Sequence, residues 1–464
     1  MCYNIKMMKQ NQQFVIPNFV QFILDFLHNH HYEAFLVGGC VRDLLLNRKV
    51  HDFDITTNAL APTLLEQAKK EGLSVIPTGL KHGTITFLIE QEMVEVTTYR
   101  IENTYLNHRK PNTVQFTSSL KEDLKRRDFT INALCIHNHQ VLDYFHGIDD
   151  LNAGMIRCIN NPNKRFNEDA LRILRALRFK CSLNFTIEDE TYKAIQTNAH
   201  LLVHISKERI RDEFIKILTS NEKNILKLLK DSNTLLEIIP EYKHAYNVSQ
   251  PSPYHIYNVF EHMNATLNAS SGTCLTIRLA LLLHDLEKVN YKTIDEKGIA
   301  HFKGHAHASA KLSKIILKRL CFPKTIIKEV YTLIEYHDYY LQPKMKTIRK
   351  FLYKLQGNYL LAYRILAVQR FDNMGKHPDI IKEKNQIIDQ VISIIQEIKK
   401  NKEVFTISGL KVNGNDMILL GYQKSEIQII LQYLLVYILN NQDKNTKEHL
   451  LKIAGGKFNE ISNR

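Results

Sequence analysis

The sequence predicts a small α/β head, with a mixed sheet and helices, followed by a chain that is almost entirely helical. In roughly the first 150 residues, runs in which apolar and polar residues alternate, such as "GTITFLIE" and "MVEVTTYR", stand between segments of helical periodicity. Such alternation is typical of half-buried strands. From about residue 160 onward, apolar residues recur at the spacing of amphipathic helices. A chain of 464 residues is also too long for one ordinary core, which predicts several domains.

The head elements are expected to follow one another as a helix, a strand that ends in a glycine turn, a helix and a second strand. Two adjacent strands come next, and then a helix that leads into a last strand. Each helix is expected from apolar residues at helical spacing, and each strand from a short apolar or alternating run. In chain order, these elements are expected at residues 18–30, 33–39, 41–47, 51–57, 83–90, 93–100 and 122–137.

Two strongly amphipathic helices, each with a capping residue ahead of it, are expected in the helical part at residues 167–183 and 206–220. A histidine-rich helical section runs over about residues 249–377, and a lysine-rich helical tail follows it. The predicted domains are the head over residues 1–150, a helical neck and body over 151–245, a histidine-rich helical domain over 246–380 and a helical tail over 381–464.

The formal net charge is +14 and the pI is near 9.2. This charge favours an anionic partner, of which nucleic acid is the common one. A lineage bias toward Lys, Asn and Ile, with no Trp, is the alternative explanation. No run of about 18 apolar residues occurs, so no membrane span is expected, and the start "MCYNIKMMKQ" does not resemble a secretory signal. The seven cysteines form no C-x-x-C pair, so we expect reduced thiols and a cytoplasmic protein.

Two carboxylates stand two residues apart in "HDFDITT", behind the glycine pair Gly38 and Gly39. Residues i and i+2 of a strand point to one face, so Asp52 and Asp54 are expected to converge, and Glu95 joins them if its strand lies alongside. Three like charges at one point repel unless a cation lies between them. Hard oxygen ligands suit Mg²⁺ shared with a substrate phosphate. A D-x-D pair alone is usually a pair of exposed acids without a functional role. The ordered set of glycines, acid pair and later glutamate is what favours a metal site.

Seven motifs occur in one order between about residues 35 and 218, namely "GGCVRD", "HDFDITT", "EVTTYR", "EDLKRRDFTINAL", "DYFHGIDDL", "RFNEDALRILRALRF" and "SKERIRDEF". In these motifs the chain resembles the class II tRNA nucleotidyltransferases, the bacterial CCA-adding enzymes. The resemblance implies a nucleotidyltransferase head followed by an all-α neck, body and tail. It also implies template-independent addition of C, C and A to the 3′ end of a tRNA acceptor stem from CTP and ATP, with release of pyrophosphate in a two-Mg²⁺ reaction.

The matched motifs imply roles for single residues. Asp52 and Asp54 would hold the Mg²⁺ ions, and Glu95 would be a third catalytic carboxylate. Arg127 and Asp128 resemble the contacts to the ribose and the triphosphate. The nucleotide-binding residues that the resemblance implies are Gly39, Arg42, Arg127, Asp128, Asn132, Asp169, Arg172, Arg175 and Arg178.

Asp169 and Arg172 stand three residues apart in "EDALR", so a continuous helix would put them on one face. A carboxylate can accept from the exocyclic amine of cytosine or adenine while an arginine donates to the ring nitrogen. Uracil and guanine would turn a carbonyl toward the carboxylate, so the pair would pass C and A and reject U and G, as the matching residues do in the family. Without that context, a plain helical ion pair is the simpler interpretation. Arg172, Arg175 and Arg178 form a stripe that is either a solvated face or a phosphate contact.

Histidines gather in "YHIYNVFEHM", "LALLLHDLEK", "HFKGHAHAS" and "EYHDYY". Their order resembles the HD phosphohydrolase fold, which implies a second divalent-metal site. The ligands that this resemblance implies are His262, His284, Asp285 and Asp372. Asp338 is the alternative last ligand, and His305 and His337 are accessory candidates. The family usually has Gly where this chain has Glu287, a carboxylate that would alter or block such a site.

Two other functions stay open. A bacterial poly(A) polymerase or an A-adding tRNA nucleotidyltransferase would share the head. Residues 99–116, "YRIENTYLNHRKPNTVQF", resemble the flexible loop of full CCA-adding enzymes and argue against a CC-adding partner enzyme. The alternative of another class is an HD-type metal-dependent phosphohydrolase with an RNA-binding head, against which the intact acid pair and "RRD" argue. The sequence makes no prediction of oligomeric state.

Overall fold

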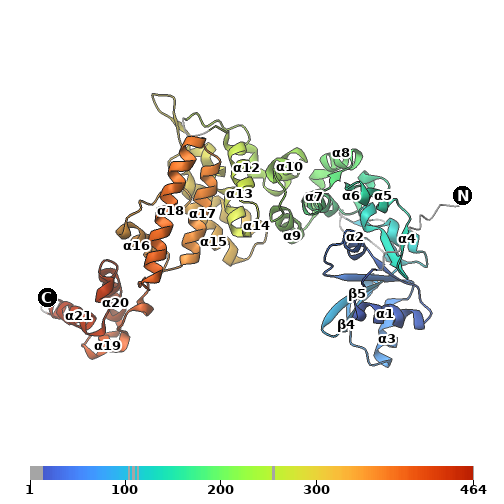
Figure 1. The fold of residues 1–464 in the computed structure, drawn as a ribbon, viewed down its shortest axis with the longest axis horizontal. Helices are drawn as coiled ribbons and strands as arrows, with labels where there is room; N and C mark the ends of the chain where they lie inside the picture. The colour runs from blue at the N-terminus through green and yellow to red at the C-terminus, as the bar shows by residue number, and fades with distance from the viewer. Residues whose placement is uncertain (1–13, 103–104, 107–109, 112–113, 253–255, 463–464) are drawn as a thin grey trace. The chain divides into compact units, whose positions relative to one another are not determined.

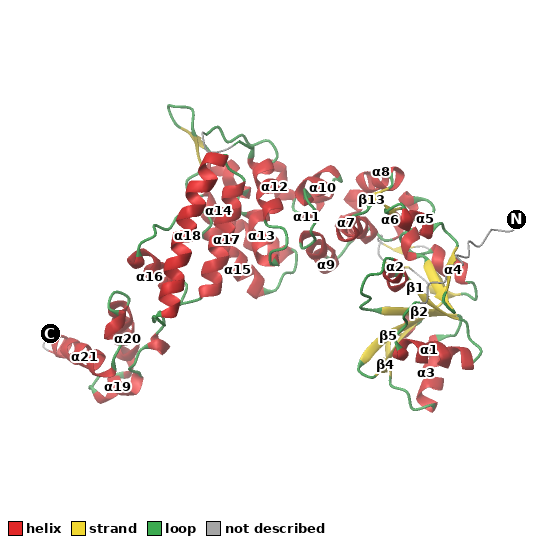
Figure 2. Cartoon of the chain, in the orientation of Figure 1, coloured by secondary structure: helices red, strands yellow, loops and turns green. Residues whose placement is uncertain are grey.

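The computed structural model describes residues 14–462, apart from residues 103–104, 107–109, 112–113 and 253–255 (Figure 1). The chain divides into two compact units, the first made of residues 1–222 and 227–240 and the second of residues 223–226 and 241–464. Strands gather in the N-terminal part, and the rest of the described chain is almost entirely helical (Figure 2). The fold class predicted from the sequence is therefore confirmed, whereas the finer division into four domains stays a prediction.

A seven-stranded mixed sheet forms the centre of the head, with the strand order β11-β10-β1-β2-β5-β4-β3. Its strands are β1 (Ala34–Val37), β2 (Phe53–Thr57), β3 (Val75–Gly79), β4 (Thr84–Ile89), β5 (Glu92–Thr98), β10 (Leu134–His137) and β11 (Gln140–Asp143). The helices of the head are α1 (Asn18–Asn29), α2 (Gly39–Leu45), α3 (Ala61–Lys70) and α4 (Leu120–Lys125). Of the six pairings in this sheet, only that of β2 with β5 is parallel.

The expected flexible loop follows β5. It contains two short antiparallel pairs, β6 (Arg100–Glu102) with β9 (Val114–Phe116) and β7 (Tyr105–Leu106) with β8 (Lys110–Pro111). Part of this loop lies outside the described residues, so its likeness to the loop of full CCA-adding enzymes stays a prediction.

The strand predicted to carry the acid pair begins two residues later than the sequence pattern predicts. β2 starts at Phe53, because its register with β5 begins there, so Asp52 lies in the loop immediately before the strand. Phe53 is 8% exposed and Ile55 1%, which places alternate side chains of β2 in the core. Asp54 lies between them in the strand and therefore points away from that core.

The neck consists of short helices and one small parallel strand pair. These elements are α5 (Gly147–Asn152), β12 (Met155–Ile156), α6 (Pro162–Glu168), α7 (Leu171–Leu183), β13 (Thr186–Ile187), α8 (Asp189–Asn198), α9 (Lys207–Leu218), α10 (Ile225–Asp231) and α11 (Thr234–Ile238). The single helix expected at residues 167–183 is wrong, because α6 ends at Glu168 and the next residue, Asp169, has an extended backbone with a φ of −138° and a ψ of 103°. Oδ1 of Asp169 accepts a hydrogen bond from the backbone N–H of Leu171 at 3.1 Å. Such local bonds offer the backbone an alternative to a continuous helix.

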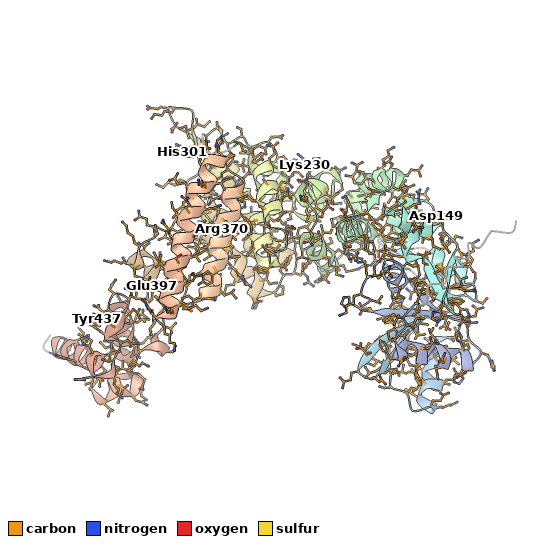
Figure 3. All side chains as sticks on the ribbon, viewed as in Figure 1. Asp149, Lys230, His301, Arg370, Glu397 and Tyr437 are labelled. Carbon is orange, nitrogen blue, oxygen red and sulfur yellow. The ribbon has the colours of Figure 1, made fainter. Side chains whose placement is uncertain are left out.

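The second unit is helical apart from one short strand pair. Its elements are α12 (Val259–Ala269), α13 (Leu275–Leu283), β14 (Thr293–Ile294), β15 (Ala300–His301), α14 (His305–Arg319), α15 (Lys324–Glu335), α16 (Met345–Lys354), α17 (Tyr359–Met374), α18 (Pro378–Lys400), α19 (Gly414–Leu419), α20 (Lys424–Ile438) and α21 (Lys447–Ser462). Tyr437 of α20, labelled in Figure 3, stacks on the ring of His449 with 5.8 Å between the ring centroids and so joins α20 to α21. Across the described residues, no helix has both the length and the apolarity needed to cross a bilayer.

Candidate active site and candidate metal centre

A cavity of about 570 Å³ in the first unit collects the head residues that the sequence singles out. It is lined by Gly38, Gly39, Cys40, Arg42, Asp43, Val50, His51, Asp52, Asp54, Arg126, Arg127, Asp128, Asn132, Asp169, Leu171, Arg172, Arg175, Arg178, Phe179 and Arg209. Every catalytic or nucleotide-binding residue expected from the sequence is among them except Glu95. Seven arginines outnumber five aspartates in this lining, so the cavity favours an anionic ligand.

The acid pair has Glu95 as its neighbour. The parallel register of β2 with β5 puts Asp54 opposite Glu95. Burial raises the pKa of the Asp54 carboxyl, and the charges of Glu95 and Asp52 raise it further against the lowering effect of Arg127. Carboxylates that oppose one another's ionisation are the arrangement that a divalent cation relieves, so these residues fit Mg²⁺. Glu95 is exposed and does not line the cavity, and its role as a third ligand stays a prediction.

The turn between β1 and α2 requires glycine at position 38. Gly38 has a φ of 82°, a conformation that side chains rarely adopt. A Cβ at this position would lie 2.9 Å from Nη1 of Arg127 and 3.9 Å from Oδ2 of Asp54. The absence of a side chain therefore lets the Arg127 guanidinium approach the acid pair.

Four of the expected residues form one hydrogen-bonded chain along the cavity wall. Nη1 of Arg42 donates to Oδ1 of Asn132 at 2.7 Å, and Nδ2 of Asn132 donates to Oδ1 of Asp128 at 3.0 Å. Nε of Arg175 donates to Oδ2 of Asp128 at 2.7 Å. Burial alone would raise the pKa of Asp128, but the charge of Arg175 and the donated hydrogen bonds hold it below its usual range. Asp128 is therefore an ionised anchor for its two partners and not a proton donor.

Asp169 and Arg172 both line the cavity, but they do not share a helix face as expected. Oδ2 of Asp169, in the break between α6 and α7, accepts from Nη2 of Arg209 at 2.9 Å. Nη1 of Arg172 donates to Oε2 of Glu168 at 2.8 Å, and its Nη2 donates to the backbone carbonyl of Arg126 at 2.7 Å. Each member of the expected base-reading pair is thus fixed by its own partner, so neither neutralises the other.

Two of the cavity residues that the sequence did not single out, Arg209 and Phe179, contact the expected ones. Arg209 of α9 stands in the quoted motif "SKERIRDEF", and the charge of that motif is the signal that marks it. Phe179 is 3% exposed and follows the arginine stripe of α7. It closes the quoted motif "RFNEDALRILRALRF", but its apolar side chain does not distinguish it from an ordinary core residue.

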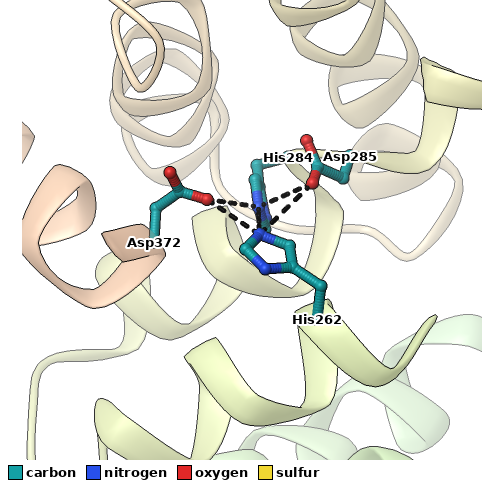
Figure 4. Close-up of side chains that lie close together, drawn as sticks. All are labelled: His262, His284, Asp285 and Asp372. Carbon is teal, nitrogen blue, oxygen red and sulfur yellow. Dashed lines mark hydrogen bonds and ion pairs between the residues drawn. The ribbon is translucent and has the colours of Figure 1, made fainter. Parts of the chain in front are cut away.

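Two histidines and two aspartates meet inside the second unit (Figure 4). His262 lies on α12, His284 and Asp285 follow α13, and Asp372 lies near the end of α17. Nε2 of His262 is 2.9 Å from Oδ1 of Asp372 and 3.5 Å from Oδ2 of Asp285. The four ligand atoms all lie within 4.8 Å of one another, and none of the four residues is more than 4% exposed. The structure thus brings Asp372 into this group, whereas Asp338 is exposed.

Backbone carbonyls orient both imidazoles. Nδ1 of His262 lies 2.9 Å from the carbonyl oxygen of Gly375, and Nδ1 of His284 lies 2.9 Å from that of Leu281. Each Nδ1–H therefore donates to a carbonyl, and each Nε2 faces the acids as a metal-ligating histidine does. Burial would lower the pKa of His284, but the charge of Asp285 raises it to about 9. The acids thus hold a proton at the point where a divalent cation would replace it, so this donor set fits a metal.

A second pair of histidines lies on the other side of Asp285. Nε2 of His305 and Nε2 of His337 are 3.3 and 3.6 Å from Oδ1 of Asp285. The other oxygen, Oδ2, faces His262 and His284. Nδ1 of each accessory histidine again lies against a backbone carbonyl. Asp285 is therefore placed to bridge two sets of ligands.

Lysines, and not Glu287, lie against the ligand carboxylates. Nζ of Lys288 lies 2.7 Å from Oδ2 of Asp285. Nζ of Lys376 lies 2.5 Å from Oδ2 of Asp372. The carboxylate of Glu287 instead accepts a hydrogen bond from Asn290 at 2.7 Å and belongs to neither group of ligand atoms. The residue that replaces the usual glycine therefore does not reach the candidate metal centre.

Two family models match the N-terminal part of the chain. Residues 34–157 match the Poly A polymerase head domain, and residues 184–246 match the probable RNA and SrmB-binding site of polymerase A.

Curated relatives carry the name CCA-adding enzyme. The one from Lactobacillus helveticus is 42% identical over 268 residues, which are 57% of this chain and 64% of that protein. The one from Enterococcus faecalis is 50% identical over 188 residues, or 40% of this chain and 45% of that protein. The chain thus spans about half to two thirds of the length of these relatives.

Solved structures share the fold over almost the whole chain. The crystal structure of the Bacillus stearothermophilus CCA-adding enzyme in complex with CTP has a TM-score of 0.68 at 24% identity, and the match covers 97% of this chain and 100% of that one. The Thermotoga maritima CCA-adding enzyme complexed with tRNA-CCA has a TM-score of 0.58 at 22% identity, with coverages of 96% and 97%. At these identities the likeness shows the fold alone. The head match and the curated relatives show that residues 34–157 match a poly A polymerase head domain and that the aligned part of the chain is similar to proteins named CCA-adding enzyme.

Proposed function

We propose that this protein is a CCA-adding tRNA nucleotidyltransferase, which joins C, C and A to the 3′ end of tRNA from CTP and ATP and releases pyrophosphate. One observation carries the proposal. A single cavity contains the acids Asp52 and Asp54, the glycine turn at Gly38 and the two residues with base-reading chemistry, Asp169 and Arg172. The names of the relatives, and neighbours solved with CTP and with tRNA-CCA, support the same reaction. A tRNA substrate and the six free cysteines among the described residues are consistent with the cytoplasm.

Asp52 and Asp54 would hold Mg²⁺, which in such reactions neutralises triphosphate charge and activates the attacking hydroxyl. The residues of the chain position the reactants. The Gly38 turn allows a triphosphate to approach the backbone closely, and arginines of the cavity pair with its oxygens. The 3′-hydroxyl of the RNA attacks the α-phosphorus and pyrophosphate leaves, so no side chain is required as a nucleophile.

Base choice would rest on Asp169 and Arg172. The carboxylate accepts from the exocyclic amine of cytosine or adenine, and the guanidinium donates to the adjacent ring nitrogen. Arg209 holds the carboxylate from the side, and Glu168 holds Arg172, so both groups are set in place before a base arrives. Uracil and guanine would put a carbonyl against the Asp169 carboxylate and be rejected.

The purified protein, incubated with Mg²⁺ and a tRNA that ends at the discriminator base, tests the proposal. CTP and ATP together are expected to add three nucleotides, and CTP alone is expected to add two. Two other results would instead identify the alternatives. A single A added to a tRNA that ends in CC, with no C added to the tRNA that ends at the discriminator base, indicates an A-adding enzyme, and a long A tail from ATP alone indicates a poly(A) polymerase. No incorporation of either nucleotide would contradict the proposal.

We also propose that the histidine–aspartate group of the second unit holds a divalent metal and supports phosphohydrolase chemistry. The support is the convergence of four buried ligand atoms within 4.8 Å. His284→Ala with Asp285→Ala is expected to remove the bound metal, measured by elemental analysis of the purified protein, together with any phosphatase or cyclic-phosphodiesterase activity. CCA addition should stay largely intact, because the acid pair belongs to the other compact unit.

Asp338→Ala is the matched control, since this aspartate is exposed and should leave the metal content unchanged. Full metal content in the folded double variant would contradict the ligand assignment. Loss of nucleotide addition together with hydrolysis would mean that the two sites are coupled.

A further inference from the structure

The ring of Phe179 borders three guanidinium groups of the cavity. Cζ of Arg178, Arg42 and Arg175 lies 4.0, 4.9 and 5.6 Å from the ring centroid, and each is within the distance of about 6 Å over which a ring face attracts a cation. The ring itself is 3% exposed. Its orientation is set by Phe129, which packs against it edge-on at 86° with 5.8 Å between the centroids. One rigid buried side chain therefore contacts all three cations.

Each of these arginines also has an acidic partner. The pairs are Arg42 with Asp43, Arg175 with Asp128 and Arg178 with Glu213. A guanidinium has more N–H donors than one carboxylate can accept, so the acid fixes one edge of the group and leaves donors for a ligand. A ring face fixes the plane of the group, because a guanidinium stacks on an aromatic ring. The acids therefore determine which edge of each guanidinium is held, and the ring determines the plane in which the group lies.

The three arginines come from two elements of the first unit. Arg42 lies on α2, whereas Arg175 and Arg178 lie on α7, which also carries Phe179. Like charges at one wall of a cavity repel. Burial lowers the pKa of Arg178, and the charge of Arg175 lowers it further against the raising effect of Glu213. The negative faces of a ring placed among the three groups oppose this repulsion.

We propose that Phe179 is a positioning residue that holds Arg42, Arg175 and Arg178 as one surface for the triphosphate of the incoming nucleotide. The inference rests on the proposed function, because it takes a nucleoside triphosphate as the ligand. Stacked arginines with free N–H donors bind phosphate oxygens well, and these three line the same cavity as the acid pair.

The base-reading residues are held by other partners. Arg209 fixes Asp169 and Glu168 fixes Arg172. Phe179 should therefore affect binding of CTP and ATP to the same extent, because both carry the same triphosphate. The preference for CTP over UTP should not change.

Equilibrium binding of CTP, ATP, UTP and cytidine to the full chain in the presence of Mg²⁺ tests the proposal. Phe179→Leu keeps an apolar side chain but removes the ring, and it is expected to weaken CTP and ATP about ten-fold. Binding of cytidine, which has no phosphate, should change little. Replacing Phe179 by 3,4,5-trifluorophenylalanine keeps the shape of the ring and weakens the negative potential of its faces, so it should cause a smaller loss in the same direction.

Phe87→Leu is the matched control. Phe87 of β4 is 0% exposed and packs edge-on against Phe26, with 5.7 Å between the ring centroids. This variant therefore also loses a buried ring, but it loses no ring contact with the three arginines. It should lower the Tm about as much as Phe179→Leu and leave CTP binding unchanged. Unchanged CTP binding in Phe179→Leu would overturn the inference. A loss in the leucine variant with none on fluorination would assign the effect to ring shape and overturn the cation–ring account. A wild-type protein that binds no CTP would overturn the proposed function itself, a result that the variants cannot mimic.

Discussion

Asp52→Ala or Asp54→Ala is expected to abolish addition of both C and A. The two carboxylates lie at the same wall of the cavity, and one metal site there would serve every nucleotide that is added. Removing a group that stabilises developing charge typically costs at least about a hundred-fold in rate. Single-nucleotide incorporation into tRNA substrates that end before the first C and before the final A measures each step separately.

A matched acid is available outside the cavity. Asp149, labelled in Figure 3, is an exposed aspartate of α5 in the same compact unit, and Asp149→Ala should leave both steps unchanged. If either Asp52→Ala or Asp54→Ala kept A addition while losing C addition, a single shared metal site would be ruled out.

Asp169→Ala is expected to reduce the use of CTP and ATP and to narrow the preference over UTP. Loss of a buried charge-assisted hydrogen bond costs about 1.5–3 kcal/mol, which corresponds to roughly ten- to a hundred-fold in rate. The rate of UTP incorporation should fall less, because a uracil carbonyl forms no such bond with Asp169 in the wild type and would no longer be repelled by it. Incorporation of all four nucleoside triphosphates by the folded variant measures the effect.

The competing interpretation is that Asp169 and Arg209 form an ordinary ion pair. Their side chains are 18% and 34% exposed, and a pair of that kind contributes under about 1 kcal/mol to stability and nothing to base choice. Arg209→Ala should loosen the carboxylate and cause a smaller loss than Asp169→Ala, with the preference for C and A largely kept. Arg211 lies on the same helix and pairs with the exposed Asp212. Arg211→Ala should therefore change neither the use of CTP and ATP nor the preference for C and A. An unaltered preference in Asp169→Ala would show that this residue does not read the base.

The head could be predicted well from the sequence because its strands are short alternating runs bounded by glycine or polar turns. The sequence predicts that Asp54 and Glu95 lie together only if their two strands are neighbours. The register of β2 with β5 confirms that they are neighbours. β3 could not be predicted, since "VIPTG" contains proline and its burial follows no clean alternation. Its place beside β4 comes from pairing across the sheet and not from local pattern.

The break at Asp169 shows where periodicity fails as a guide. Apolar spacing continues from α6 into α7, so the pattern predicts one helix, but the carboxylate of Asp169 bonds to the N–H of Leu171 and to Arg209. The second of these partners lies on another helix, and no local pattern connects it with the break. In the second unit, the resemblance to the HD fold singled out His262, His284 and Asp285 in the motifs "YHIYNVFEHM" and "LALLLHDLEK", and the structure brings these three residues together. The choice of Asp372 over Asp338 needed the packing of α17 against α12 and α13.

The single parallel strand pair of the head has a consequence for the order in which the protein folds. Antiparallel neighbours can be joined by a tight hairpin, but a parallel pair needs a long crossover connection. Between β2 and β5 the chain runs through α3, β3 and β4. Closing such a non-local pairing is slow, because the chain entropy is lost before the new contacts form. Asp54 and Glu95 face each other across this pair alone, so we expect the acid cluster to assemble late, after the hairpin of β4 and β5 has formed. A chain in which β4 and β5 have paired but β2 has not yet joined them would therefore still keep Asp54 apart from Glu95.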